Sequence, residues 1–276
     1  MKTLVRNKDI ILSDVKNFIL SETLDCGQAF RWSETEDGAF EGVAFGKYLK
    51  LAATEDGIIL YDTTEEDFLN IWKDYFDLDR DYGEIIGIIS ENEVLKTASG
   101  FAGGIRILRQ DPWEALCSFI ISQNNNIPRI KSIVERLCAT FGEEVKEGFY
   151  SFPSAERIAA LTLEDLAPLR SGFRAKYILD GAKRVANGEI DLDALKTLGL
   201  DEARQELMRI YGVGEKVADC TLLFGLSHID AFPKDVWIKK AMAKLFDGAL
   251  PECAAPYAGI AQQYIFHYAR MTKLEI

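Results

Sequence analysis

Residues 207–220 read LMRIYGVGEKVADC, and this stretch decides the fold that the sequence predicts. A helix is expected to end near Tyr211, Gly212 and Gly214 permit a tight turn with positive φ, and a second helix is expected to begin directly afterwards. The exposed amides of such a turn, together with the start of the second helix, can bind a phosphate group. A lone Gly-x-Gly between helices is equally typical of a plain connector, whereas the longer string that includes Lys216 is much more specific.

Lys216 lies in the first turn of that second helix. A single lysine on a helix is most often a solvated surface charge. Here the positive end of the helix dipole, together with partial burial, disfavours the charged ammonium and favours the neutral amine. A neutral lysine amine can act as a nucleophile in Schiff-base chemistry, so Lys216 is a candidate nucleophile.

A carboxylate follows nineteen residues later, in residues 225–237, which read GLSHIDAFPKDVW. Asp235 precedes an amphipathic segment and is therefore predicted to be the N-cap of a helix. Taken alone, this cap is a structural feature. A capped carboxylate is also ionised and oriented, and it can stabilise positive charge that develops nearby during a reaction. Asp230 is the competing carboxylate, but no helix is expected directly after it.

The character of the chain changes near residues 100–110. Residues 39–62 are rich in aromatic and β-branched side chains, with turns near residues 36–38 and 55–57, so we expect an antiparallel meander and a β-rich first hundred residues with one short helix from Thr64. From residue 111 onward, Asp-Pro-Trp marks a helix start and apolar residues recur with the helical period. Later helices are expected over residues 127–141, 154–161, 162–169, 175–187, 191–198, 201–211, 215–224, 235–245 and 256–271.

Composition narrows the class of protein. The chain has 276 residues and 48% hydrophobic residues, which is ample for a buried core. It has no run of about 18 apolar residues and no apolar signal segment, so neither a membrane-spanning helix nor a secretory signal is expected. Its 5 cysteines are widely spaced without a Cys-x-x-Cys, which argues against a disulfide scaffold or a structural zinc site. We therefore expect an intracellular, cytoplasmic protein without a metal or another cofactor.

The net charge of −12 is unusual for a protein that binds nucleic acid, because phosphate contacts call for basic side chains. The acidity is unevenly distributed. Residues 1–100 hold 10 Lys and Arg against 21 Asp and Glu, whereas residues 101–276 hold 22 against 23. The second part is thus close to neutral and can present a basic face, which weakens the objection to DNA binding.

Three further stretches carry unusual patterns. Residues 26–32 read CGQAFRW, residues 118–130 read SFIISQNNNIPRI and residues 169–177 read LRSGFRAKY. Taken alone, the first is equally typical of a glycine at a strand bulge, and the second is more typical of an Asn-rich turn. Together with residues 207–220 and 225–237, they resemble the 8-oxoguanine DNA glycosylase family of the helix-hairpin-helix base-excision glycosylases, and the resemblance covers nearly the whole chain.

The resemblance implies an α+β fold in two parts. A twisted antiparallel β domain, similar to the TATA-binding protein, is expected over residues 1–107, and an all-α helix-hairpin-helix core over residues 108–276. The core is expected either as one body or as two helical lobes with the active-site cleft between them. The protein is expected to act as a monomer on double-stranded DNA that contains oxidised guanine. Only Cys253 lies near the C-terminus, so the four-cysteine iron–sulfur cluster of related glycosylases is not expected.

The resemblance also implies how the damaged base is bound. Gly27 would offer its backbone carbonyl to the N7 hydrogen, which 8-oxoguanine has and guanine lacks. Gln262 would hydrogen-bond the Watson–Crick edge, Phe266 would stack on the ring, and Cys220 would pack on its opposite face. Without the resemblance, Phe266 and Cys220 are typical core residues.

Contacts with the rest of the DNA are implied as well. Asn124 would fill the gap that the extruded base leaves, and Arg129 would read the orphaned cytosine. Phe173 matches an aromatic wedge that is usually tyrosine, and Arg174 matches a second reader of the cytosine. The hairpin glycines, Gly212 and Gly214, would lie against a DNA phosphate.

Two positions depart from the family pattern. Pro233 matches the proline that precedes the catalytic aspartate, but Trp237 stands where a histidine is common, near the phosphate of the flipped nucleotide. Ala269 stands where an aspartate is expected. These departures leave lesion affinity and opposite-base preference open.

The implied activity is bifunctional. Lys216 would attack the C1′ atom of a flipped nucleotide, displace the base and form a Schiff base that permits β-elimination, with Asp235 as its carboxylate partner. The first alternative is a monofunctional glycosylase for alkylated purines, which activates water and needs no lysine. The second is a non-enzymatic helix-hairpin-helix DNA-binding module. The third, motivated by the acidic composition, is an intracellular protein with no role on DNA.

Overall fold

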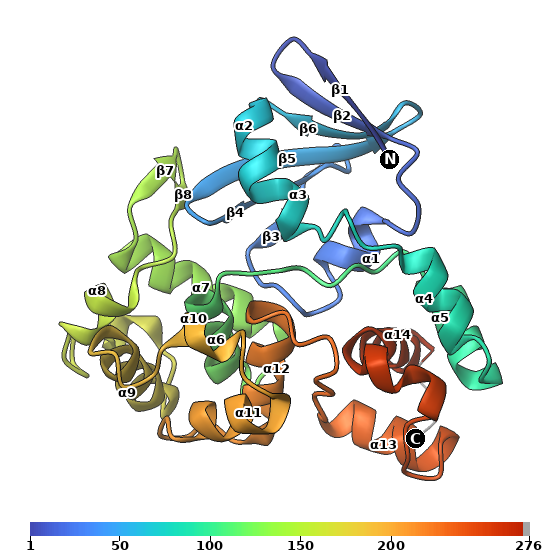
Figure 1. The fold of residues 1–276 in the computed structure, drawn as a ribbon. Helices are drawn as coiled ribbons and strands as arrows, with labels where there is room; N and C mark the ends of the chain where they lie inside the picture. Colours follow the sequence, from blue (N-terminus) through green and yellow to red (C-terminus); the bar gives the residue numbers. More distant parts are fainter. Residues whose placement is uncertain (273–276) are drawn as a thin grey trace.

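A six-stranded antiparallel sheet opens the computed structural model, which describes residues 1–272 (Figure 1). Its strand order is β1-β2-β6-β5-β4-β3, and all neighbouring strands pair antiparallel. The strands are β1 Lys2–Arg6, β2 Asp9–Ser13, β3 Trp32–Glu34, β4 Phe40–Ala44, β5 Lys47–Thr54 and β6 Gly57–Tyr61. Turns at residues 36–38 and 55–56 join β3 to β4 and β5 to β6, which confirms the predicted meander.

The prediction of a β-rich first hundred residues is wrong beyond residue 64, where the chain becomes helical. The Thr64 hydroxyl accepts a hydrogen bond from the Asp67 amide at 3.0 Å, so the predicted helix start is confirmed. Asp81 and Asn92 cap two further helices in the same way, and these start signals are present in the sequence. The helical elements up to residue 102 are α1 Leu20–Leu24, α2 Glu65–Asp67, the π-helix η1 Phe68–Trp72, α3 Lys73–Tyr75, α4 Tyr82–Ile89 and α5 Glu93–Ala102.

The rest of the chain is mostly helical, as predicted. Its helices are α6 Pro112–Ser122, α7 Ile127–Phe141, α8 Ala155–Ala159, α9 Arg174–Ala186, α10 Leu192–Leu195, α11 Leu200–Met208, α12 Glu215–Gly225, α13 Val236–Leu245 and α14 Ala258–Met271. The short elements among them are β7 Glu144–Lys146, β8 Phe149–Tyr150 and the 3-10 helices η2 Ala167–Leu169 and η3 Glu252–Tyr257.

One predicted helix is wrong. Residues 162–169 form a turn followed by the short η2 helix. Thr162 and Asp165 hydrogen-bond each other's backbone amides, which closes a single turn. Pro168 has no N–H group and cannot extend an α-helical hydrogen-bond ladder, so the turn does not grow into a helix.

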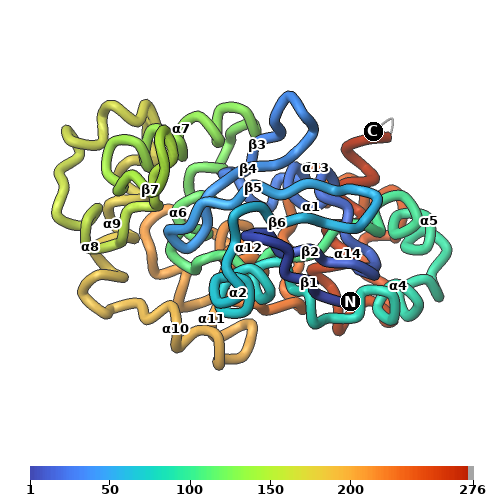
Figure 2. The backbone as a smooth tube through the Cα atoms, turned by 90° about the horizontal axis from the view of Figure 1, so that it is seen from above, coloured from blue at the N-terminus to red at the C-terminus, as the bar shows by residue number. Residues whose placement is uncertain are grey.

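Two hydrophobic clusters hold the molecule together. The smaller cluster lies between the sheet and helices α1 to α3, and its centre includes Trp32, Trp72 and Phe76. The larger cluster joins the remaining helices and also takes in Cys26 and Phe30 from the N-terminal part. Helices α4 and α5 lie beside α14 in both ribbon and tube views (Figure 2), so segments far apart in sequence close this end of the molecule. The domain boundary expected between residues 107 and 108 stays a prediction.

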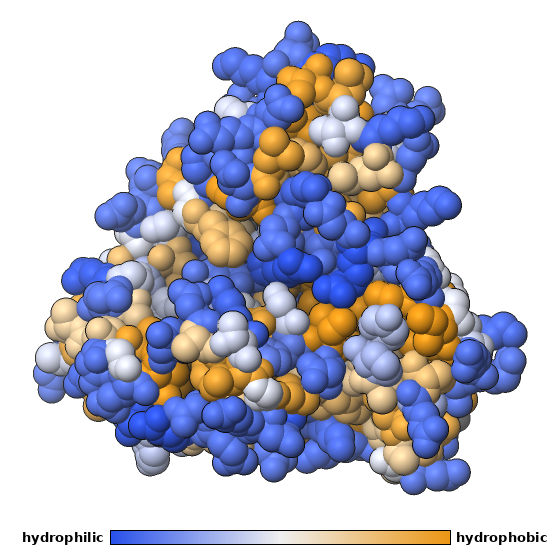
Figure 3. Space-filling model, in the orientation of Figure 1, coloured by the Kyte–Doolittle hydropathy of each residue, from blue (hydrophilic) through white to orange (hydrophobic). Residues whose placement is uncertain are grey.

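Polar side chains cover most of the face shown in Figure 3, with apolar side chains exposed in separate patches. None of the helices within residues 1–272 has the length and apolarity that crossing a bilayer requires.

Candidate active site

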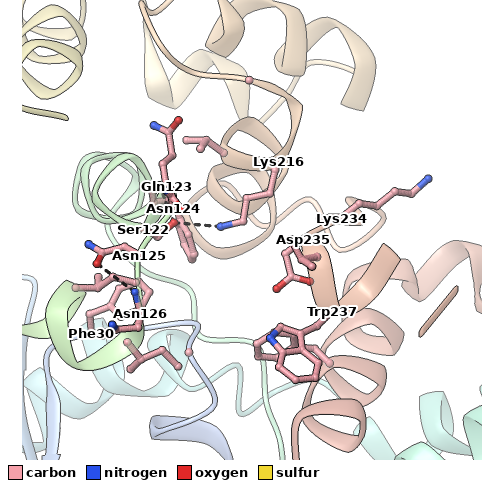
Figure 4. A pocket seen from close by; sticks show the side chains of 18 of the residues that line it. Phe30, Ser122, Gln123, Asn124, Asn125, Asn126, Lys216, Lys234, Asp235 and Trp237 are labelled. Carbon is pink, nitrogen blue, oxygen red and sulfur yellow. Dashed lines mark hydrogen bonds between the residues drawn. The ribbon is translucent and has the colours of Figure 1, made fainter. Parts of the chain in front are cut away.

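A cavity of about 920 Å³ opens between the α6–α7 loop and the starts of α12 and α13 (Figure 4). A second cavity of about 50 Å³ adjoins it and reaches α14. The two cavities share the lining residues Gly27, Phe119, Lys216, Asp235 and Phe266. We call them the large and the small cavity.

The structure brings most of the predicted site residues to these cavities. Eight of them line the large cavity: Gly27, Asn124, Phe173, Gly214, Lys216, Asp235, Trp237 and Phe266. Three more line the small cavity: Cys220, Pro233 and Gln262. The remaining three, Arg129, Arg174 and Gly212, line neither cavity.

The hairpin between α11 and α12 has one turn position that requires glycine. Gly212 has a φ of +82°, and a Cβ atom built on it would lie 2.5 Å from the ring of Tyr177. The expectation of positive φ at Gly214 is wrong, because this residue is the extended N-cap of α12 with a φ of −105°. Glycine at this cap adds no side chain over the first amides of α12, which therefore stay open to a ligand.

Polar contacts fix the hairpin to its neighbours. The Arg204 guanidinium on α11 pairs with the Asp219 carboxylate on α12 at 2.6 Å. The Asp180 carboxylate on α9 accepts a hydrogen bond from the Tyr211 amide at 2.8 Å, just before the turn. These contacts set the direction in which α12 begins, and with it the position of Lys216.

Lys216 is half-buried, and its side chain extends toward Ser122 (Figure 4). Its Nζ atom donates a hydrogen bond to the Ser122 hydroxyl at 3.1 Å and lies 5.2 Å from the centre of the Phe119 ring. In the part of the chain that the structure describes, no ion pair joins this amine to a carboxylate. The amine thus contacts uncharged groups, and no carboxylate of the described residues forms an ion pair with it.

Asp235 is the N-cap of α13, as predicted, because its Oδ1 atom accepts a hydrogen bond from the Ile238 amide at 2.8 Å. Its carboxylate also faces the side of the cavity on which Lys216 lies (Figure 4). Burial raises the pKa of Asp235 above its usual value, whereas the Ile238 amide and the charge of Lys216 oppose that rise. The same residue thus caps a helix and presents a carboxylate to the amine.

Gly27 lies in the loop between α1 and β3 with a φ of +90°, and not at a strand bulge. The fully buried side chain of Gln28 fixes this loop. Its amide donates hydrogen bonds to the carbonyls of Thr23 at 2.9 Å and Arg106 at 2.8 Å, and it accepts one from the Leu108 amide at 2.9 Å. The loop backbone that carries Gly27 is therefore tied to the segment that precedes α6.

Two adjacent glutamines form a chain of amides at the small cavity. The Gln262 side chain donates to the Pro233 carbonyl at 3.1 Å, and the Gln263 side chain donates to Gln262 Oε1 at 2.8 Å. Sequence reasoning missed Gln263, although its place beside Gln262 was the available signal. Across this cavity, burial raises the pKa of the Cys220 thiol to about 11, opposed by the nearby Lys216 charge.

The residues predicted to contact the rest of the DNA are held differently. Phe173, Arg129 and Asn124 are exposed. The backbone of Asn124 is in the left-handed region, with a φ of 46°. Arg174 is buried, and its guanidinium donates hydrogen bonds to the carbonyls of Gln123 at 2.8 Å, Asn124 at 2.9 Å and Ser171 at 3.1 Å. Arg174 therefore ties the Asn-rich loop to α9, and its role as a second cytosine reader stays a prediction.

The two departures from the family pattern lie in different surroundings. Trp237 is 40% exposed and lines the large cavity, so its ring is available to a ligand there. Ala269 is fully buried on α14 and lines neither cavity.

Comparison with known proteins accounts for both halves of this architecture. Residues 10–116 match the 8-oxoguanine DNA glycosylase N-terminal domain, and residues 117–248 match the HhH-GPD superfamily of base excision DNA repair proteins. A probable N-glycosylase/DNA lyase of Methanothermobacter thermautotrophicus is 30% identical over 72% of this chain and 74% of its own length. The chain belongs to the 8-oxoguanine DNA glycosylase family. Its α+β fold, with an antiparallel sheet before a helical core, is the one that the sequence predicted.

Other members of this family resemble the chain to different extents. The N-glycosylase/DNA lyase of Saccharomyces cerevisiae is 39% identical over 50% of this chain, which spans only 40% of that relative's length. A crystal structure of the Clostridium acetobutylicum 8-oxoguanine glycosylase/lyase, with double-stranded DNA that contains cytosine opposite 8-oxoguanine, is 40% identical. It superimposes with a TM-score of 0.94 and covers 99% of each chain.

Proposed function

We propose that this protein is a bifunctional DNA glycosylase and lyase that excises 8-oxoguanine from double-stranded DNA and then nicks the strand. The observation that carries the proposal is the arrangement of Lys216 and Asp235, which face a common cavity while no carboxylate within residues 1–272 pairs with the lysine amine. The names of its relatives, N-glycosylase/DNA lyase and 8-oxoguanine glycosylase/lyase, support the same activity.

The chemistry begins once the damaged nucleotide has left the base stack, because its C1′ atom is inaccessible inside the duplex. The neutral amine of Lys216 attacks C1′, a nitrogen–carbon bond forms, and the bond to the base breaks with its electron pair leaving on the base. The attacking nitrogen loses a proton. Asp235 stays ionised and stabilises the positive charge that builds up on the sugar as the bond breaks.

The covalent sugar then supplies the lyase activity. Opening of the sugar ring converts the C1′ amine adduct into a Schiff base, which makes a C2′ hydrogen acidic. A base takes up that proton, the electron pair left behind forms a C2′–C3′ double bond, and the 3′ phosphate leaves with the electrons of its bond to C3′, which nicks the strand. The Schiff base is the species that borohydride reduces, which makes the mechanism directly testable.

We assign the remaining residues by their places around the two cavities. Gly27, Gln262, Phe266 and Cys220 are proposed to bind the flipped base at the small cavity, next to Pro233. The neighbouring large cavity is proposed to take the sugar and its phosphate, against Trp237 and the amides that follow Gly214. Gly212 holds the hairpin turn that presents these amides.

The outer edge of the large cavity is proposed to contact the rest of the duplex. Asn124 would occupy the gap in the stack, Phe173 would wedge the duplex open, and Arg129 and Arg174 would read the orphaned cytosine. We further propose that the protein works as a monomer in the cytoplasm, associated with the nucleoid.

Borohydride trapping tests the proposal. The wild-type protein should form a covalent adduct with a duplex that holds 8-oxoguanine opposite cytosine, and Lys216→Gln should form none. Lys234→Gln is the matched control, because Lys234 also lines the large cavity but its side chain points away from Asp235 (Figure 4). Release of alkylated purines by the wild type without any trapping would overturn the proposal in favour of a monofunctional glycosylase.

A further inference from the structure

The hydroxyl group of Ser122 lies beside the amine of Lys216. Ser122 is the last residue of α6, and its Oγ atom has two partners. It donates a hydrogen bond to the Phe119 carbonyl at 2.7 Å and accepts one from Lys216 Nζ at 3.1 Å (Figure 4). Sequence reasoning placed no role on this residue.

The direction of the two hydrogen bonds follows from the chemistry of the partners. A serine hydroxyl has one hydrogen and two lone pairs, and a backbone carbonyl can only accept. The single hydrogen of Ser122 is therefore committed to the Phe119 carbonyl. Ser122 can only accept from Lys216, whether the lysine is an ammonium or a neutral amine.

This constraint limits where the reactive electron pair of the neutral amine can lie. One N–H bond must point at Ser122, so the lone pair points elsewhere. The face of the Phe119 ring, 5.2 Å from Nζ, carries negative charge density, which attracts N–H groups and repels a lone pair. Both groups belong to α6, and they direct the lone pair away from that helix into the cavity that Asp235 also lines.

We propose that Ser122 is a positioning residue that orients the Lys216 amine for its attack on the sugar. The inference rests on the proposed function and adds a residue to it. Ser122 does not relay a proton, because its hydrogen is bonded to the backbone carbonyl of Phe119, and that carbonyl cannot pass a proton on. It acts only by holding one N–H bond of the nucleophile.

Two substitutions separate this role from a structural one. Ser122→Ala removes the acceptor, whereas Ser122→Thr keeps it, because a threonine hydroxyl in a helix can also bond the carbonyl three residues earlier. Ser132→Ala is the matched control. Ser132 is a half-buried helical serine whose hydroxyl accepts a hydrogen bond from Arg136 on the same helix.

The first measurement is the single-turnover rate of borohydride trapping at saturating duplex, with the duplex Kd measured separately. Ser122→Ala should trap about 10- to 100-fold more slowly with an unchanged Kd, since a misplaced reacting group costs rates of this order. Ser122→Thr should recover most of the wild-type rate, and Ser132→Ala should retain it. Equal trapping by Ser122→Ala and the wild type would overturn the inference and leave the proposed function standing.

The second measurement needs no DNA. Formaldehyde with cyanoborohydride methylates lysine amines without requiring a fixed approach, and mass spectrometry of the peptide that contains Lys216 reports its rate. Ser122→Ala should methylate Lys216 at least as fast as the wild type, while it traps DNA more slowly. A loss of both rates would show that Ser122 supports the amine or the local fold and would overturn the orienting role. A wild-type protein that methylates but never traps would contradict the proposed function, and the inference would fall with it.

Discussion

The two sides of the large cavity differ in how their side chains are held. Lys216 and Asp235, which we call the catalytic wall, stand at the starts of α12 and α13 and point into the cavity. Asn124 and Phe173 line the opposite edge, and together with Arg129 and Arg174, which line neither cavity, they form what we call the reading rim. Its members are exposed to solvent or, for Arg174, bonded to the protein's own backbone.

The difference teaches how each side obtains its geometry. The catalytic wall is fixed by local features of the chain, namely a glycine turn, two helix starts and a cap. The reading rim depends on a loop that α9 holds from fifty residues away, through Arg174. We therefore expect chemistry to depend on the catalytic wall and on Ser122, which orients its amine. Stability, DNA binding and opposite-base preference should depend on the rim.

The largest effect in this comparison is expected from Asp235→Asn on the catalytic wall. Asparagine caps a helix about as well as aspartate, so the free energy of unfolding should be nearly unchanged. The negative charge is lost, and the single-turnover excision rate should fall about 100- to 1000-fold. Asp235→Ala is the control that removes cap and charge together and should also cost about 1 kcal/mol of stability. An active Asp235→Asn protein would remove the charge from the mechanism.

The pH dependence of the wild-type excision rate is a second test of the Asp235 carboxylate. Burial raises the pKa of Asp235 above 3.8, so the carboxylate becomes protonated at a higher pH than an exposed aspartate. The contribution of this charge to excision should accordingly be lost as the pH falls through the raised pKa, and it should be fully present above it. The residual activity of Asp235→Asn should lack this acid limb in a rate profile between pH 4 and 8.

An intermediate effect is expected from Arg174→Met at the reading rim. The substitution leaves the partly buried carbonyls of Gln123 and Asn124 without their charged donor, which should cost about 1–3 kcal/mol in urea unfolding. The loop that carries Asn124 should loosen, and duplex binding should weaken with it. Unchanged stability together with altered base preference would instead make Arg174 a reader of DNA alone.

The smallest effect on the free protein is expected from Arg129→Met. Its side chain is exposed, so the free energy of unfolding should change by less than about 0.5 kcal/mol. The preference for cytosine among the four opposing bases should nevertheless drop by about 1–3 kcal/mol, measured as the ratio of excision rates. Equal losses of stability in Arg129→Met and Arg174→Met would erase the distinction between the two arginines.

The features that the sequence predicted correctly are each determined by residues that are close together in the chain. The turn at Gly212, the start of α12 and the cap at Asp235 each depend on residues a few positions apart, so their pattern is visible in the chain. The inward orientation of Arg174 depends on carbonyls of a distant loop, and the Ser122–Lys216 contact joins residues 94 positions apart. Such pairings arise only from the packing of α6 against α9 and α12.

Other misses had a signal that was available. Asp81 and Asn92 are typical N-cap residues, and they cap α4 and α5. The strand-rich composition of the residues before them nevertheless predicted a β-rich segment there. In the opposite direction, the capped turn at Thr162 predicted a helix that Pro168 does not allow to grow.

The loop that carries Gly27 has a consequence for how this protein can evolve. The group proposed to distinguish damaged from normal guanine is a main-chain oxygen, and every amino acid has one. Point mutations cannot delete this oxygen, but Gly27 has a φ of +90° and a Cβ atom on it would lie 3.1 Å from the Ile127 side chain, so any substitution there would displace the oxygen. Its neighbour Gln28 is vulnerable as well, because its buried amide anchors the loop through three hydrogen bonds to the backbone. Loss of lesion discrimination can therefore also arise at a residue that lines neither cavity.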